Sequence, residues 1–182
     1  MMTLRDEMPL FRAVLGDSKP VKAIDLELQS CDVHRACELN ELWHSRLPKI
    51  HWSNVVRNKN YCCYLFLHND IAYASSIWSS PVARSFDAEI TLELRRLAIA
   101  PDAPKNTASR MIGLMVKDIK NKMKDIELLI SYQDTEVHSG TIYKASNWTA
   151  ACTNRGQSWS NKTRQRNEEQ TLAAKTRWEY AL

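Results

Sequence analysis

The sequence predicts one α/β domain in which helices flank a mixed central sheet. Segments with the two-residue apolar alternation of strands alternate along the chain with segments that have helical apolar spacing, as such a fold requires. The length of 182 residues fits a single domain, and 44% hydrophobic with 25% charged residues is typical of a globular protein. No apolar run approaches the ~20 residues that a membrane-spanning helix needs. Five cysteines without CxxC spacing predict reduced thiols in an intracellular protein.

The first half of the chain predicts a strand, a helix and a hairpin. Alternating apolar residues indicate a strand over Pro20–Gln29. Helical spacing indicates a helix over Asp32–Arg46, which Pro48 ends. Two runs rich in apolar and aromatic residues, Tyr61–Leu67 and Ile71–Trp78, flank three polar residues and therefore predict a hairpin.

The second half of the chain predicts strands that alternate with helices. In chain order we expect a strand, an amphipathic helix, a strand, a short helix and one or two closing strands: Glu89–Ala100, Thr107–Met123, Ile126–Tyr132, Ser139–Asn147 and 148–166. The chain after Asn167 is helix-prone but weakly patterned. We therefore expect a domain over residues 1–166 and a C-terminal tail over 167–182.

The strand over Glu89–Ala100 has an irregular apolar pattern. Strict alternation divides its four large apolar side chains between two faces, Leu92 and Leu94 on one and Leu97 and Ile99 on the other. One extra residue at Arg95–Arg96 brings all four to the same face, so we predict a β-bulge there. The alternative is a strand buried on both faces, which two adjacent arginines fit poorly because charges are rarely buried unpaired.

The turn between this strand and the next helix predicts an anion site built without glycine. Only four glycines occur, and none lies between Gly16 and Gly113, which excludes a P-loop and a dinucleotide-binding fingerprint. The first N–H groups of a helix have no internal partner and attract anions. The residues expected to bind a phosphate there are Lys105, Asn106, Ser109 and Arg110, assisted by Arg95 or Arg96. The alternative is simple capping of the helix with solvated bases.

A carboxylate, an imidazole and a phenol follow the strand over Ile126–Tyr132. Asp134 falls at the carboxyl edge of that strand, where open α/β sheets bind ligands. His138 precedes the next helix, and Tyr143 lies about one turn into it. These groups can act as base and acid in proton transfer. When each residue is taken alone, a cap or core packing is the better explanation.

The net charge of +4 arises near the C-terminus. Residues 141–182 hold seven basic and three acidic side chains, and no acid occurs from Lys144 to Arg166. The basic side chains are interleaved with aromatic ones: Lys144, Arg155, Lys162, Arg164 and Arg166 with Trp148 and Trp159. This mixture suits a phosphate backbone with unstacked bases, which would bind in a salt-dependent manner. The alternative is a solvated basic tail with two core tryptophans.

Three segments resemble the Mom family of bacteriophage DNA adenine-modification proteins, which has a GNAT-like (acyl-CoA N-acyltransferase-like) fold. They are LELRRLAIAPDAPKNTASRMIG (92–113), ISYQD (130–134) with HSGTIYKASNW (138–148), and ELWHSRLP (41–48). The resemblance implies an enzyme that converts the adenine N6 amine in DNA to an N6-carbamoylmethyl (acetamido) group. It also implies that the protein acts in the cytoplasm of the infected bacterial host and protects phage DNA from restriction.

The same resemblance implies which residues form the site. An acetyl-CoA-type donor would be bound by Arg95, Arg96 and Ser109, and the catalytic candidates are His44, Asp134, Tyr143 and Ser109. Asp134 would accept the N6 proton, and Tyr143 would protonate the leaving thiolate or orient the donor carbonyl. An iron requirement with His44 as metal ligand, and a pocket lined by Tyr61, are further implications.

Two other functions remain open from the sequence. A GNAT-type N-acetyltransferase acting on a small amine or a protein would have the same donor site without a nucleic-acid partner. A catalytically silent DNA-binding module would use the fold as a scaffold, and replacing Tyr143 or Asp134 would then change only stability.

Overall fold

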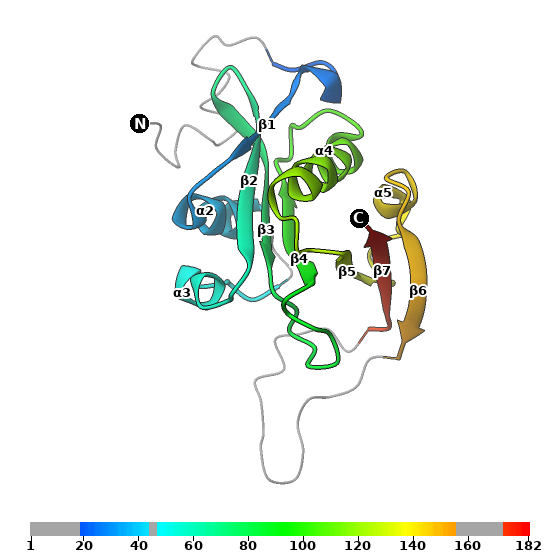
Figure 1. The fold of residues 1–182 in the computed structure, drawn as a ribbon. Coiled ribbons are helices and arrows are strands. Elements are labelled where there is room, and N and C mark those ends of the chain that lie inside the picture. The colour runs from blue at the N-terminus through cyan, green and yellow to red at the C-terminus, as the bar shows by residue number, and fades with distance from the viewer. Residues whose placement is uncertain (1–18, 44–46, 156–172) are drawn as a thin grey trace.

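The computed structural model describes residues 19–43, 47–155 and 173–182 (Figure 1). Within these ranges seven strands form one sheet, in the order β1-β2-β3-β4-β5-β7-β6. The strands are β1 (Glu27–Ser30), β2 (Tyr61–His68), β3 (Ile71–Ser79), β4 (Thr91–Ile99), β5 (Leu128–Asp134), β6 (Thr149–Asn154) and β7 (Lys175–Ala181). The helices are the 3-10 helix η2 (Ala23–Asp25), α2 (Val33–Trp43), α3 (Trp52–Val56), α4 (Thr107–Lys122) and α5 (Thr141–Lys144).

The sheet is mixed, and helices cover both of its faces. All neighbouring strands are antiparallel except β4 and β5, which run parallel. Figure 1 shows α2 and α3 on one side of β2–β4 and α4 on the other. The larger buried cluster includes Phe66, Trp78 and Met115 under α4, and a smaller one includes Ala36 and Ile77 under α2. The predicted α/β fold with a mixed central sheet is confirmed. Among the described helices, none is long and apolar enough to cross a membrane.

The first predicted strand is only partly correct. The structure has β1 at Glu27–Ser30 but a 3-10 helix at Ala23–Asp25. The Asp25 carboxylate accepts hydrogen bonds from the backbone N–H groups of Val21 and Lys22, at 3.1 and 2.9 Å. Such side-chain-to-backbone bonds offer the chain an alternative to strand pairing. The predicted hairpin is confirmed as β2 and β3, and the predicted amphipathic helix as α4.

The end of the chain is a strand and not a helix-prone tail. Residues Lys175–Ala181 form β7, which lies between β5 and β6 in the sheet. Its residues Thr176 and Trp178 are buried, and their neighbours along the strand are partly exposed. The weak pattern after Asn167 left the fold of this segment undecided, and the structure has a strand in its described part. Strand formation here depends on pairing with elements distant in sequence, which local propensity does not record.

The β-bulge predicted in β4 is confirmed. Leu94 pairs with Trp78 and Arg96 with Ile77, and these two partners are consecutive on β3, so Arg95 is the extra residue. The four large apolar side chains of the strand all belong to, or pack against, the cluster under α4: Leu92, Leu94, Leu97 and Ile99. The bulge therefore turns one face of β4 into a continuous apolar surface.

Replacing Gly140 with alanine is expected to destabilise the fold by about 3 kcal/mol. Gly140 has a φ of +75°, and a Cβ there would overlap the Trp178 ring and lie 2.6 Å from Gln133 Oε1. The Trp178 indole N–H donates to that oxygen at 2.7 Å, so neither group can shift freely. Denaturant unfolding measures the change. The control is Gly113→Ala in α4, where no atom lies within 4 Å of the added Cβ.

The control variant is expected to gain roughly 0.5–1 kcal/mol, because alanine favours a helix interior over glycine. Equal losses of stability in the two variants would contradict the close packing described for Gly140.

Candidate active site

The parallel strands β4 and β5 separate halfway along their length. Thr91 to Leu94 pair with Leu128 to Ser131, and the pairing between the two strands ends there. Beyond that point β4 remains paired with β3, and β5 with β7. The facing edges of β4 and β5 therefore carry backbone groups that no described strand pairs. Buried backbone groups need hydrogen-bond partners, so an extended ligand with amide groups suits this position.

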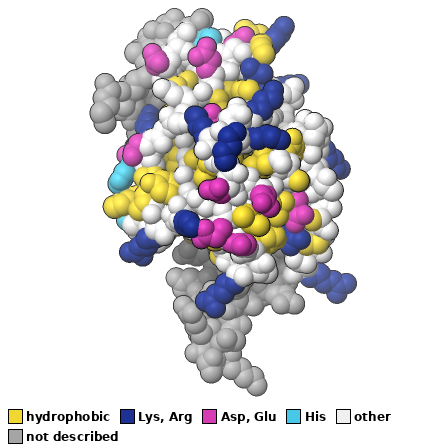
Figure 2. All heavy atoms as spheres, in the orientation of Figure 1, with side chains coloured by type: hydrophobic (Ala, Val, Ile, Leu, Met, Phe, Trp, Pro, Cys, Tyr) yellow, Lys and Arg dark blue, Asp and Glu magenta, His cyan; other side chains and the backbone are white. Residues whose placement is uncertain are grey.

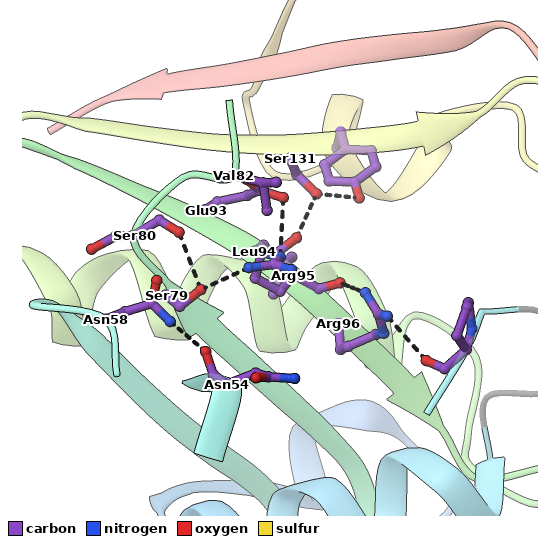
Figure 3. A network of polar contacts seen from close by, with 12 residues as sticks. Asn54, Asn58, Ser79, Ser80, Val82, Glu93, Leu94, Arg95, Arg96 and Ser131 are labelled. Atoms are coloured by element: carbon purple, nitrogen blue, oxygen red, sulfur yellow. Dashed lines mark hydrogen bonds and ion pairs between the residues drawn. The ribbon is translucent and has the colours of Figure 1, made fainter. Parts of the chain in front are cut away.

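A tyrosine hydroxyl lies at the point where the two strands separate. Ser131 Oγ donates to the Leu94 carbonyl at 3.3 Å and lies 2.8 Å from the Tyr143 hydroxyl; Figure 3 labels Ser131 and Leu94. Tyr143 comes from α5, is 7% exposed, and stacks on Trp178 with ring centroids 5.3 Å apart. Burial raises the pKa of the Tyr143 phenol above its ordinary value. The phenol therefore stays protonated at neutral pH and is able to donate a proton.

A buried carboxylate and β3 hold the Arg95 side chain. Arg95 Nε lies 3.4 Å from Glu93 Oε1, and Nη1 donates to Ser79 Oγ at 3.2 Å (Figure 3). The other Glu93 oxygen accepts the Val82 backbone N–H at 3.0 Å. Burial raises the pKa of Glu93, and the Val82 bond and the arginine charges act in the opposite direction. Glu93 was not among the residues predicted from the sequence. A single acid inside an apolar strand, two residues before an arginine, is the signal that points to it.

The Arg96 guanidinium is partly buried on the α2 side of β4. Its Nη1 donates to the Arg95 carbonyl at 2.8 Å and its Nη2 to the Pro48 carbonyl at 3.2 Å. Burial, followed by the nearby Arg95 charge, lowers the pKa of Arg96 to about 10. Arg96 pairs with Ile77, which packs in the cluster under α2. Contrary to the expectation from the sequence, the arginine pair does not reach the first turn of α4. The bulge turns both side chains to the other face of the sheet.

The first turn of α4 lies next to α5. The hydroxyl of Ser146, just after α5, donates to the Ser109 carbonyl at 2.9 Å. Asn106 is the N-cap residue, with a φ of 67°, but its side chain makes no capping hydrogen bond. The residues expected to bind an anion occur here, two exposed and two half-buried: Lys105, Asn106, Ser109 and Arg110. These four residues thus lie at the end of α4 that contacts the helix of Tyr143.

Asp134 ends β5 on the face opposite Tyr143. Ser131 faces Tyr143, and alternation along the strand places Asp134 on the other side. Asp134 Oδ1 accepts the Glu136 N–H at 3.0 Å, and the Asp134 carbonyl accepts the His138 N–H at 3.1 Å. The His138 side chain is exposed. Asp134 and the Tyr143 hydroxyl therefore lie on opposite faces of the sheet, with Asp134 three residues beyond Ser131 along β5.

The predicted nucleic-acid surface is only partly described. Lys144 and Arg155 are exposed, and the other predicted residues fall outside the described ranges: Trp159, Lys162, Arg164 and Arg166. Trp148 is 4% exposed, and its ring packs against Trp78, Tyr143 and Tyr180. The expectation that Trp148 stacks on a DNA base is wrong, because the ring would have to leave the close-packed core to do so.

The described residues do not fit an iron site. Across 19–43, 47–155 and 173–182, no group of three or more His, Cys, Asp or Glu side chains is placed to hold a metal ion. Iron sites commonly combine two histidines with a carboxylate. His44, the expected ligand, lies outside the described residues, and Tyr61 is 42% exposed on β2. We therefore derive no step through a metal ion.

Solved structures with the same fold are GNAT-type acetyltransferases. One is a GNAT family acetyltransferase from Elizabethkingia anophelis with acetyl-CoA bound, at a TM-score of 0.60 and 11% identity over 87% of this chain and 99% of that one. Another is the ribosomal-protein-S18-alanine N-acetyltransferase from Escherichia coli, at 0.59 and 11% over 86% and 93%. A spermidine N-acetyltransferase from Vibrio cholerae gives 0.62 and 8% over 87% and 94%. These similarities establish a GNAT-like fold.

Family membership follows from the sequence itself. No curated protein sequence matches the chain significantly. The sequence model described as the Mom protein family matches residues 25–181, which include the β4 bulge, the start of α4, Asp134 and Tyr143. The resemblance noted from three short segments is thereby confirmed, and it extends over nearly the whole chain. The chain belongs to the Mom protein family.

Proposed function

We propose that this protein is a transferase that modifies the N6 amine of adenine in DNA with a group derived from an acetyl-CoA-type donor, forming N6-carbamoylmethyladenine. One observation carries the proposal. The buried Tyr143 hydroxyl lies at Ser131, where β5 separates from β4, and the Asp134 carboxylate lies at the end of β5, three residues further along the strand. A proton donor and a proton acceptor on neighbouring parts of one strand suit the transfer of a group to an amine.

The opening between β4 and β5 is the proposed donor site. An extended thioester chain with amide groups would pair with the free strand edges, as a further strand does. Its phosphate end would reach the first turn of α4, where helix N–H groups attract anions and Lys105 and Arg110 add positive charge. The Ser146 hydroxyl, just after α5, donates to the Ser109 carbonyl in that turn, so the two helices are in contact. The phosphate end and the thioester end of the donor would therefore lie in one site.

The two catalytic groups have distinct roles in this proposal. The adenine amine is a weak nucleophile because its lone pair is delocalised into the ring, so a base must accept its proton as the new bond forms. Asp134 accepts that proton. Tyr143, which burial keeps protonated, donates one to the departing thiolate. The carbamoylmethyl group is joined to N6 through the former methyl carbon of the acetyl group, so one N–H and one C–H bond are lost and a two-electron acceptor must take the two hydrogens. An ammonia-type nitrogen donor then replaces sulfur at the carbonyl, and the thiolate leaves with the proton from Tyr143. The described residues supply neither the two-electron acceptor nor the nitrogen donor.

The acceptor in this proposal is duplex DNA with the target adenine turned out of the helix, because an enzyme cannot reach the amine inside the stack. Lys and Arg side chains are interspersed with Asp and Glu on the face in Figure 2, so that face has no uniformly positive surface for a phosphate backbone. We assign the phosphate contacts to the exposed Lys144 and Arg155, together with the basic residues that follow them in the sequence.

Mass spectrometry of nucleosides tests the proposed function. DNA from cells that express the chain is expected to contain an adenosine heavier by a carbamoylmethyl group, and DNA from cells with Tyr143→Phe is not. An adenosine heavier by an acetyl group would keep DNA as acceptor but correct the transferred group. Unmodified DNA, together with acetylation of a small amine or a protein by the pure enzyme, would overturn the proposal in favour of an ordinary N-acetyltransferase.

A further inference from the structure

One face of the C-terminal half of the sheet carries a group of flat side chains that the chemistry above does not use. Tyr132 on β5 is the neighbour of Arg177 on β7. Both lie on the face opposite Trp178, which stacks on Tyr143. The loop before β4 adds Phe86, whose ring lies under the Arg177 guanidinium at 5.0 Å. We propose that this group is a purine-binding subsite, in which the acceptor base stacks beside Arg177 and Phe86. The inference rests on the proposed function.

The Arg177 guanidinium is fixed as a flat surface. Its Nε lies 2.7 Å from Glu179 Oε1, and Phe86 supports one side of it. The Arg177 side chain is nevertheless 26% exposed, so part of it remains open to a ligand. A guanidinium whose plane is already set loses little freedom when a base stacks on it, and bases commonly stack on arginine and aromatic side chains.

Tyr132 and Asp134 determine the orientation in which a purine would bind in this subsite. They are two residues apart on β5, which places them on one face about 6.6 Å apart along the strand. Burial and then the Glu93 charge raise the pKa of Tyr132, against the effect of Arg177, so its phenol stays neutral. A purine that stacks beside Arg177 therefore has a neutral hydrogen-bonding group at one end and the Asp134 carboxylate at the other. The carboxylate end suits the exocyclic amine.

The charges of this face favour a base over a phosphate. Arg177 is paired with Glu179, and Lys175 is the strand neighbour of Asp134. Each cation thus has an acid close by, whereas a phosphate site needs positive charge in excess. A flat, uncharged ring is the ligand that such a balanced surface accommodates. A cationic amine such as a polyamine would instead bind to the carboxylates alone and would not need the flat side chains of Arg177 and Phe86.

Two site variants and two matched controls test the subsite. Phe86→Leu and Arg177→Gln are expected to raise KM for DNA roughly tenfold, because each removes part of the stacking surface. The dissociation constant for acetyl-CoA is expected to remain unchanged in both. Trp52→Leu, at an exposed aromatic residue of α3, and Arg35→Gln, at an arginine of α2 paired with Glu38, are matched controls that should change neither quantity. Unfolding curves establish that all four proteins are folded.

Four results would overturn the inference. An unchanged KM for DNA in both Phe86→Leu and Arg177→Gln would remove the subsite but leave the proposed function intact. Equal weakening of DNA and acetyl-CoA binding would assign these side chains a structural role. Full activity of Arg177→Lys would show that charge, and not a flat group, is required. If the wild-type protein forms no modified adenosine, the proposed function fails and this inference fails with it.

Discussion

Replacing Tyr143 with phenylalanine is expected to lower kcat by at least about 10²-fold, the usual contribution of a proton donor in the transition state. Phenylalanine fills the same space and keeps the stacking on Trp178, so only the hydroxyl at the separation of β4 and β5 is lost. Ser131 loses one hydrogen-bond partner but keeps the Leu94 carbonyl, which costs about 1 kcal/mol of stability. Single-turnover rates on DNA and calorimetric binding of acetyl-CoA measure the two effects separately.

The pH profile provides a check on this role. Because burial raises the pKa of the Tyr143 phenol, the acid form persists through neutral pH and is lost only in strongly alkaline solution. We therefore expect the kcat of the wild-type protein to show no decline caused by loss of the Tyr143 proton at or near neutral pH. Ser131→Ala is the control that keeps the phenol and removes its hydrogen-bond partner. Its kcat should lie between the kcat of the wild type and that of Tyr143→Phe. Normal turnover by Tyr143→Phe would rule out the phenol as proton donor.

Replacing Asp134 with asparagine is expected to lower kcat by about 10²-fold or more, because an amide cannot accept the amine proton. Asparagine has the same size and its oxygen still accepts the Glu136 N–H, so the turn after β5 should be preserved. The rate of adenosine modification at saturating DNA measures the loss. KM for DNA is expected to change less than kcat, since the neutral side chain retains a hydrogen bond to the base.

Asp118→Asn is the matched control for this substitution. Asp118 lies on α4, accepts the Tyr64 hydroxyl at 2.9 Å and pairs with Lys122 at 2.9 Å, on the side of the helix that contacts β2. Its replacement should lower stability slightly and leave kcat unchanged. A similar loss of kcat in Asp118→Asn would show that the effect at Asp134 reflects lost negative charge in general and not a base at the site.

Local sequence patterns predicted the part of the fold that depends on neighbours in the chain. The spacing of Leu92, Leu94, Leu97 and Ile99 required an extra residue, and the structure has the bulge at Arg95. The amphipathic pattern of α4 and the polar tip of the β2–β3 hairpin were equally explicit. In each case side chains a few residues apart already determine which face is buried.

Features that depend on distant parts of the chain could not be predicted in this way. Trp148 and Arg155 lie in the same basic, aromatic stretch, and the sequence predicted that both contact DNA. Only the packing of Trp148 against Trp78 and Tyr180 reveals that Trp148 is a core residue. The strand β7 forms because β5 and β6 pair with it. The position of Tyr143 at the separation of β4 and β5 follows from its bond to Ser131, a residue that the sequence did not single out.

A crystal structure of the protein with acetyl-CoA bound tests the central claim most directly. We expect the thioester to lie between β4 and β5, with its sulfur within hydrogen-bonding distance of the Tyr143 hydroxyl and its phosphates at the first turn of α4. A donor bound elsewhere, out of contact with both Tyr143 and the facing edges of these strands, would contradict the account.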